Sequence, residues 1–258
     1  MLENLWVERR NLLLQAGSLV LSGCGGGSPV ISIPAAPVCL SSLVPAYFYK
    51  PAPWEALAAT RQSTVVIANA SNGPGNRHDA QYQAWIDGVR SAGHRVKGYV
   101  YTRYGQRAAT TVLADMDAWA QLYGVSDFFL DEVSATLSDV PYYRSLLASA
   151  IAITPARRFM LNPGTAPDAA YFSLLPDIEV LVFENAWSSR NGSSLPATLD
   201  AVASQCWLMA LSATEADMLQ VAAMAKSRRF AGFFATNLPY TAGLPAYWET
   251  HKALAVCS

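Results

Sequence analysis

The sequence predicts a single-domain (β/α)8 barrel, the α/β fold class in which eight parallel strands alternate with helices around a closed sheet. Three observations support it: short apolar runs recur at similar intervals, helical patterns fill most gaps, and no Gly-x-Gly-x-x-Gly turn follows the first run. Alternating strands and helices imply a parallel sheet, and the missing turn favours a barrel over a doubly wound sheet. The apolar runs begin near Val44, Thr64, Arg95, Asp127, Arg158, Glu179, Cys206 and Phe230.

The first part of the chain has the layout of an export signal and stays outside the predicted fold. Arg9 and Arg10, which resemble a twin-arginine signal, precede an apolar stretch that is short for a membrane span. The residues from Leu21 to Cys24 then resemble a bacterial lipobox, in which cleavage leaves a lipidated cysteine. The alternative is a plain secretory signal with a chance cysteine. We therefore expect a signal peptide over 1–23, a lipidated N-terminus and flexible tether over 24–38, and the barrel over 39–258.

Three further cysteines bear on the redox state of an exported protein. Cys39 precedes the first predicted strand and Cys257 ends the last helix, so a closed barrel would bring the two together. An oxidising compartment permits a disulfide, and we expect this pair to form it. Cys206 opens a strand and is expected to be a buried thiol. Because the count is odd, the residues alone leave the pairing open.

Helical patterns occupy the gaps between several runs. Apolar residues at helical spacing cover 82–89 and 112–123, and a glycine that can end the helix follows each. A third pattern covers 218–225, and Thr214 with Asp217 forms a capping box at its start. These segments are expected to be the helices that cover the outside of the barrel.

Composition narrows the range of partners. The net charge is −1 and no basic run follows the first ten residues, so a nucleic-acid partner is not expected. His78, His94 and His251 make no ligand-spaced pair, which argues against a histidine-rich metal site, and we expect no cofactor. Seven Trp and twelve Tyr could stack on sugar rings, although aromatic residues more often fill cores. We expect a monomer.

Two of the apolar runs end in carboxylates. Asp131 and Glu132 end the run that starts at Phe128, and Glu184 ends the run that starts at Val180. Carboxylates are costly to bury, and the active sites of these barrels lie at the carboxyl ends of the strands. The pattern therefore predicts carboxylates facing one site, with a salt-bridged or capping acid as the alternative for each. Other strands also end in polar residues, for which binding and loop solvation are equally reasonable: Tyr49, Asn69, Tyr101, Asn162 and Asn237.

A set of ordered motifs between about Val44 and Trp248 resembles the spherulin-4 family of cell-surface proteins. The one departure is Asn69-Ala70, where an Asn-Pro pair is expected, and it affects a loop rather than the acids. The motifs are Pro45-Ala46-Tyr47-Phe48-Tyr49, Gly73-Pro74-Gly75, Gly98-Tyr99-Val100-Tyr101-Thr102-x-Tyr104-Gly105-x-Arg107, Phe129-Leu130-Asp131-Glu132, Leu161-Asn162-Pro163-Gly164-Thr165, Phe183-Glu184 and Leu244-Pro245-x-Tyr247-Trp248.

The resemblance implies a (β/α)8 glycoside hydrolase that acts within a polysaccharide. Characterised relatives cleave α-1,4-linked N-acetylgalactosamine or galactosamine polymers of biofilm matrix, and the acids they use correspond to Asp131, Glu132 and Glu184. A lectin-like surface module and a structural envelope lipoprotein are the alternatives without turnover. Residues expected to bind the polysaccharide are Tyr47, Tyr49, Asn69, Tyr99, Tyr101, Tyr104, Arg107, Asn162, Trp187 and Asn237.

Glycoside hydrolysis needs two carboxyl groups flanking the scissile bond. Successive strand residues point to opposite faces, so Asp131 and Glu132 cannot both face the barrel axis within a regular strand. On the sixth strand, Val182 and Glu184 are expected to share a face. We assign Asp131 as nucleophile and Glu184 as general acid/base of a retaining reaction, with Glu132 orienting the sugar or tuning Asp131. In the alternative assignment Glu132 performs the chemistry and Asp131 binds an N-acetyl group.

The lipobox generates a first prediction. Replacing Cys24 with Ser should move the protein from the membrane fraction to the soluble fraction, because the acyl groups would no longer be attached. Fractionation of cells followed by immunoblotting measures the change. A wild-type protein already soluble outside the cytoplasm would contradict the lipid anchor.

Overall fold

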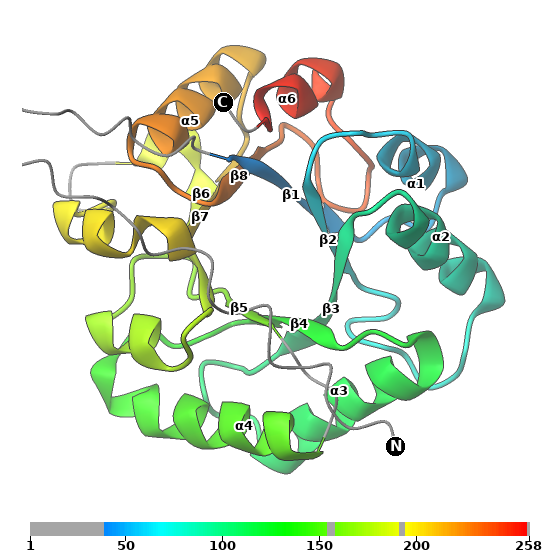
Figure 1. The fold of residues 1–258 in the computed structure, drawn as a ribbon, viewed down its shortest axis with the longest axis vertical. Helices are drawn as coiled ribbons and strands as arrows, with labels where there is room; N and C mark the ends of the chain where they lie inside the picture. Colours follow the sequence, from blue (N-terminus) through cyan, green and yellow to red (C-terminus); the bar gives the residue numbers. More distant parts are fainter. Residues whose placement is uncertain (1–38, 154–157, 191–193, 257–258) are drawn as a thin grey trace, which may run out of the picture. The chain divides into compact units, whose positions relative to one another are not determined.

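The described residues of the computed structural model form one closed barrel with its helices on the outside (Figure 1). They are 39–153, 158–190 and 194–256, and they belong to a single compact unit that starts at Pro37. Each strand is parallel to the next, and the last pairs with the first. The strands are β1 (Ser41–Ala46), β2 (Thr64–Ala68), β3 (Arg95–Tyr101), β4 (Asp127–Asp131), β5 (Phe159–Leu161), β6 (Glu179–Ala186), β7 (Cys206–Leu211) and β8 (Gly232–Ala235).

The predicted fold class is confirmed, and each strand begins within a few residues of its predicted start. After β5 and β6, however, the described chain forms short 3-10 helices, over Ala169–Ser173, Trp187–Ser189 and Ala197–Gln205. The α-helices are α1 (Pro51–Ala58), α2 (Ala80–Ser91), α3 (Ala109–Tyr123), α4 (Val140–Ile153), α5 (Glu215–Ser227) and α6 (Trp248–Leu254).

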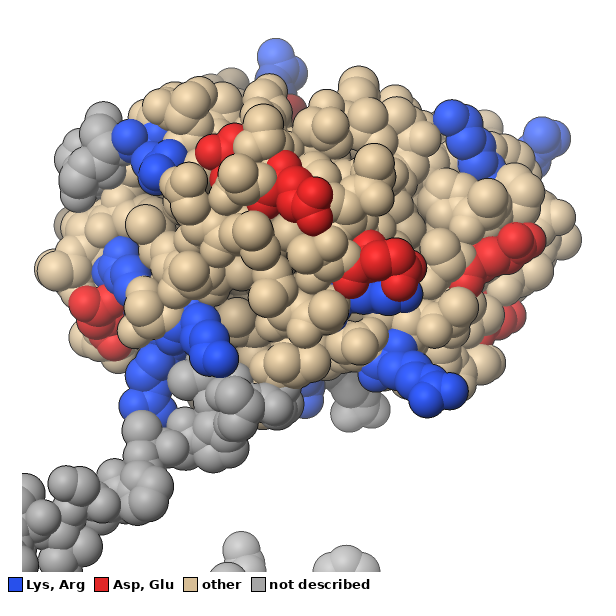
Figure 2. All heavy atoms as spheres, turned by 90° about the horizontal axis from the view of Figure 1, so that it is seen from above, with Lys and Arg blue, Asp and Glu red and all other residues tan. Residues whose placement is uncertain are grey.

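Apolar side chains form two clusters. One includes the barrel interior and continues to the faces of α1 to α4, and the other lies between β6–β8 and α5. The predicted capping box at the start of α5 is present, with Thr214 and Asp217 bonded reciprocally. On the face that Figure 2 shows, basic and acidic side chains of the described residues are interspersed over a largely uncharged surface.

A buried ion pair joins β3 to β6 inside the amino end of the barrel. The fully buried Lys97 ammonium lies 2.8 Å from the Glu179 carboxylate, and the Arg95 guanidinium lies 3.1 Å from it. Burial alone would raise the pKa of Glu179, but the charges of Lys97 and Arg95 hold it below its ordinary value. Two cations therefore share one carboxylate at this end of the molecule.

The cysteines are placed only in part. Cys39 is disulfide-bonded, and Cys206 is a free thiol whose burial raises its pKa to about 12. Cys24 and Cys257 lie outside the described residues, so the lipid anchor and the Cys39–Cys257 pairing stay predictions. In the part of the chain that is described, no helix has the length and hydropathy needed to span a bilayer.

The barrel can close as it does because residue 232 is a glycine and has no side chain. A Cβ at this position would lie 2.2 Å from the carbonyl oxygen of Ser41 and 2.3 Å from the Trp207 ring. Gly232 pairs with both β1 and β7, so a shift there would disturb the point where the sheet closes.

We predict that Gly232→Ala lowers the free energy of unfolding by about 3 kcal/mol, because a backbone atom cannot move aside cheaply. Denaturant unfolding measures the effect. Gly88→Ala is the matched control, since a Cβ added at this position of α2 would have no atom within 4 Å. That helix position should instead gain up to about 1 kcal/mol. Equal effects of the two variants would contradict this account of closure.

Candidate active site

Asp131 lies at the carboxyl end of β4, where two neighbouring side chains fix its orientation. The Tyr99 hydroxyl, from β3, donates to Oδ2 at 2.8 Å, and the Asn162 amide, just after β5, donates to Oδ1 at 2.7 Å. The side chain is half-buried. The two donors hold both oxygens of the side chain in place.

Asn162 also bonds the second acid. Its Nδ2 donates to Oε2 of Glu184 at 2.5 Å, while its Oδ1 accepts the N–H of Gly164 at 2.9 Å. The carbonyl of Gly164 in turn accepts the N–H of Glu184 at 3.0 Å. Because the Gly164 N–H occupies the amide oxygen, the NH2 group must face the two carboxylates.

This bridge limits the separation of the two carboxyl groups. The hydrogens of an amide nitrogen point about 120° apart, so acceptors at 2.7 and 2.5 Å from Nδ2 lie about 4.5 Å from each other. Carboxyl groups are about 5–5.5 Å apart in retaining glycosidases and about 6.5–9.5 Å apart in inverting ones. The arrangement of Asp131 and Glu184 therefore fits the shorter class.

A β-bulge turns Glu184 toward Asn162, and here the predicted alternation on β6 is wrong. The register with β7 shifts between Leu181 and Phe183. Val182 and Phe183 both pack in the cluster toward α5, whereas Leu181 belongs to the interior cluster. Glu184 consequently lies on the face opposite Val182. Without the extra residue, regular alternation would have turned its side chain away from the site.

Tyr240, in the loop after β8, completes the group, although the sequence did not point to it. Its hydroxyl lies 2.7 Å from Oε1 of Glu184 and 2.8 Å from Sδ of Met209. With one hydrogen and two acceptors, it can donate to either. When the Tyr240 hydroxyl donates to Met209, its oxygen can accept a hydrogen bond from a protonated Glu184. Tyr47 packs edge-on against Tyr99 and Tyr240, and its role in binding stays a prediction.

The pKa shifts of these groups indicate which of them carries a proton and which donate hydrogen bonds. Burial raises the pKa of Glu184, and the charge of Asp131 raises it further, although the bonds from Asn162 and Tyr240 act the other way. Burial and the two acids also raise the pKa of Tyr99 and Tyr240. The tyrosines therefore stay protonated donors, and Glu184 is the acid best suited to carry a proton.

Glu132 follows the end of β4 in a left-handed conformation, with φ +50. Its carbonyl accepts hydrogen bonds from the Tyr104 N–H and the Thr102 hydroxyl. The carboxylate has no bonded partner among the described residues, but its charge contributes to the raised pKa of Tyr99. Glu132 thus lies near Asp131 without joining the bridge through Asn162.

The other predicted binding residues lie at the carboxyl end of a strand or in the loop that follows one. Tyr101 and Arg107 line a hollow of about 550 Å³ formed by the loops after β2 and β3, and the guanidinium lies 4.1 Å from the centre of the Tyr101 ring. The Oδ1 atom of Asn69 accepts the N–H of Gly73, so this side chain shapes the β2 loop. The remaining three are exposed: Tyr49, Tyr104 and Asn237.

Trp187 requires a correction. Its ring is 1% exposed, packs against Phe183 and is covered by Arg190, so it cannot serve as a platform for a sugar ring. The side chain belongs to the core outside β6 and β7. Within the described ranges, no three His, Cys, Asp or Glu side chains are grouped as a metal site would need.

Known proteins share the sequence features of this chain. The family model for spherulation-specific family 4 matches residues 41–255, which is nearly the whole barrel. The chain belongs to this family. Spherulin-4 of Physarum polycephalum is 36% identical over 152 residues, covering 57% of this chain and 45% of that protein. The match thus spans less than half the length of this relative.

Solved structures share the barrel. Sph3 of Aspergillus clavatus, crystallised in complex with GalNAc, superposes with a TM-score of 0.70 at 25% identity, over 85% of this chain and 98% of Sph3. The Bacillus cereus spore cortex-lytic enzyme SleL reaches 0.53 at 8% identity, over 84% and 74% of the two chains. A Rhizomucor miehei chitinase reaches 0.50 at 11% identity, over 84% and 98%. The latter two show the fold alone, a barrel of the type found in glycoside hydrolases.

The raised pKa of Glu184 generates a stability prediction. Below about pH 4.3, the usual pKa of Glu, the group is protonated in both folded and unfolded chains and imposes no cost. As pH rises from this value to the folded pKa, ionisation of the unfolded chain lowers the free energy of unfolding, and the full cost remains above the folded pKa. Glu184→Gln should therefore raise the free energy of unfolding by about 1 kcal/mol at neutral pH, and the gain should disappear below about pH 4.

Denaturant unfolding at several pH values measures this, with Glu55→Gln as control because Glu55 is exposed on α1. The control should change stability by less than about 0.5 kcal/mol. A destabilised Glu184→Gln at neutral pH would mean that the hydrogen bonds of Glu184 outweigh its burial.

Proposed function

We propose that the protein is a retaining glycoside hydrolase that cuts within α-1,4-linked N-acetylgalactosamine or galactosamine exopolysaccharide. The observation that carries the proposal is the amide of Asn162, which donates to Asp131 and to Glu184. With ideal amide geometry, the two bonded oxygens lie about 4.5 Å apart. Two carboxyls at this distance, one with a raised pKa, suit double displacement. The match to Sph3, whose structure contains GalNAc, supports the choice of sugar.

In the first step, Asp131 attacks the anomeric carbon while Glu184 gives its proton to the leaving glycosidic oxygen. A covalent bond forms between the sugar and Asp131, and the bond to the leaving chain breaks. In the second step, Glu184, now ionised, takes a proton from water, which attacks the same carbon and releases Asp131. The sugar thus keeps its anomeric configuration.

The neighbouring donors assist this cycle. Tyr99 and Asn162 hold the Asp131 oxygens in place for attack. Tyr240 can follow the protonation of Glu184, because its hydrogen can go to the carboxylate or to Met209. Glu132, which lacks a bonded partner among the described residues, orients the sugar or tunes Asp131. The exposed aromatic rings of Tyr49 and Tyr104, 60% and 58% exposed, are positioned to contact a long polymer.

We further propose that the enzyme is exported and lipid-anchored in the bacterial cell envelope, in the periplasm or on the outer surface. The lipobox ending at Cys24 supports this location, and a matrix polysaccharide would be encountered there. The tether over 24–38 would give the barrel reach from the membrane.

Substitution of the three acids tests the proposal. With a purified α-1,4-galactosaminoglycan, Asp131→Asn should lower the rate of oligosaccharide release by about 1000-fold or more, because an amide cannot attack the sugar. Glu184→Gln should lose about 100- to 10,000-fold, with partial recovery on substrates whose leaving group needs no proton. Glu132→Gln should lose less. Mass spectrometry of the released oligosaccharides measures each rate, and Glu55→Gln is the surface control.

The outcomes separate the alternatives. Polymer binding should persist in Asp131→Asn, which shows that the site is intact. An inactive Glu132→Gln together with an active Asp131→Asn would reverse their roles. If all three variants equal the wild type, or the wild type binds polymer without cutting it, the protein is a carbohydrate-binding module.

A further inference from the structure

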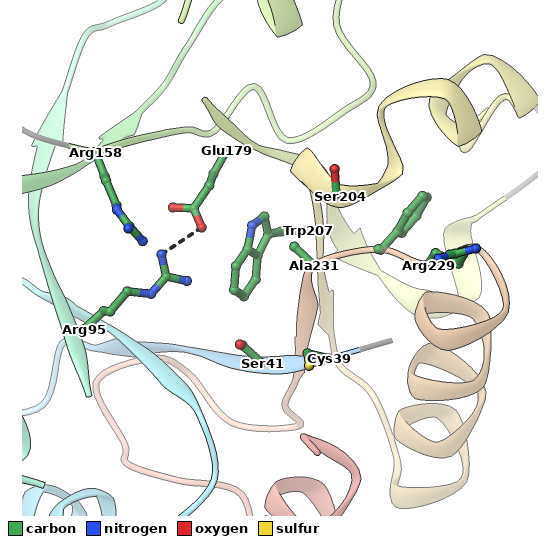
Figure 3. Close-up of a pocket in the computed structure, with 10 residues that line it drawn as sticks. Cys39, Ser41, Arg95, Arg158, Glu179, Ser204, Trp207, Arg229 and Ala231 are labelled. Atoms are coloured by element: carbon green, nitrogen blue, oxygen red, sulfur yellow. Dashed lines mark hydrogen bonds and ion pairs between the residues drawn. The ribbon is translucent and has the colours of Figure 1, made fainter. Parts of the chain in front are cut away.

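The amino end of the barrel holds a second hollow, opposite the carboxylates. It has a volume of about 430 Å³, and the residues that line it come from the starts of strands or from the turns before them (Figure 3). The site with Asp131 lies at the other ends of these strands. The lining residues used below are Ser41, Arg95, Arg158, Glu179, Trp207 and Arg229.

Positive charge predominates in this hollow. Arg95, Arg158 and Arg229 line it, and the ammonium of Lys97 lies behind Glu179. The opposing carboxylates are Glu179, Asp177 in the adjoining hollow, and Asp127 at the start of β4, whose charge acts on Lys97. Glu179 is already shared between Lys97 and Arg95. Cationic charge therefore exceeds anionic charge around the hollow.

The guanidiniums of Arg158 and Arg229 have no partner among the described residues, and that of Arg158 lies beside Arg95 in Figure 3. Arg158 is exposed, and its guanidinium makes no hydrogen bond or ion pair with the residues that the structure describes, although its backbone carbonyl accepts the Phe128 N–H. Figure 3 shows its side chain extending toward Glu179 and Arg95, although that carboxylate is bonded to Arg95. A guanidinium held beside another guanidinium is favourable when an anion lies between them.

A buried donor in the same hollow also lacks an acceptor. The Trp207 side chain is 1% exposed, and its Nε1 has no hydrogen-bond partner in the described part of the chain. The ring lies in the middle of the lining residues in Figure 3, with the Arg95 guanidinium 5.9 Å from its centre. A buried indole N–H without an acceptor is unfavourable, so an oxyanion here would satisfy a group that the protein leaves unpaired.

We propose that this opening binds a phosphate-type oxyanion, with Arg158, Arg95 and the Trp207 N–H as donors and the Ser41 hydroxyl at the rim. The anion could be free phosphate or the phosphate of a phospholipid headgroup. The second source is suggested by the sequence, because Cys39, the first described residue, lines the hollow and the predicted lipidation site at Cys24 precedes it in the chain. If the chain is lipid-anchored, headgroup binding would place the active site away from the membrane.

Inorganic phosphate tests the site itself. The full chain carrying Cys24→Ser, which removes the lipidation position, is heated in phosphate and in chloride at equal ionic strength. Phosphate should raise the melting temperature. Arg158→Gln should weaken the apparent affinity about tenfold, the loss expected for one charge-assisted contact. Arg144→Gln is the matched control, since this arginine is exposed on α4, away from the hollow, and it should leave the affinity unchanged.

A second variant tests whether the anion binds close to Lys97 and Glu179. Glu179→Gln removes the carboxylate that pairs with the buried Lys97. A bound phosphate would replace that charge, so the rise in melting temperature should be larger in Glu179→Gln than in the wild type. Should this variant fail to fold, the comparison of Arg158→Gln with Arg144→Gln still decides.

Vesicles distinguish the source of the anion. Flotation with phosphatidylglycerol vesicles, compared with vesicles of phosphatidylcholine alone, should recover the Cys24→Ser chain and recover it less with Arg158→Gln. Recovery with anionic vesicles supports a headgroup ligand, and a response to phosphate without recovery supports free phosphate. If neither probe distinguishes Arg158→Gln from Arg144→Gln, the proposed anion site is wrong. Neither readout depends on hydrolysis, so failure of the anion site and failure of the proposed function can be told apart.

Discussion

The hydrogen bonds from one amide nitrogen, Nδ2 of Asn162, organise the carboxyl end of this barrel. They hold acids from β4 and β6 together across β5, and the bond from Gly164 to Oδ1 fixes which way the amide faces. Because both N–H groups of this amide donate to the acids, neither carboxyl can rotate freely. The result is a pre-organised pair in which the half-buried Glu184 has a raised pKa.

The bridge depends on an irregular strand. Regular pairing along β6 would turn Glu184 toward α5, and the bulge between Leu181 and Phe183 returns it to the interior. Tyr240 then bonds it from the loop after β8. Burying an acid in this way opposes folding, and the rest of the barrel offsets the cost through its two large apolar clusters.

Much of this arrangement could be predicted from sequence because its signals are local. Apolar runs gave the strand positions, and acids directly after two of them gave Asp131 and Glu184. The bulge could not be predicted in this way, since it appears only when the β6–β7 register is known. Tyr240 lies in a loop whose folding over Glu184 depends on tertiary contacts. Trp187 follows a strand as binding residues do, but packing against Phe183 buries it.

The central claim is that the bridged acids act as nucleophile and acid/base at the separation of a retaining enzyme. Proton NMR of the products during the first minutes of hydrolysis, before mutarotation, tests it most directly. The account predicts that the new reducing ends appear first as the α anomer, the configuration of the substrate. Initial release of the β anomer would show a single displacement by water and would contradict the role assigned to Asp131.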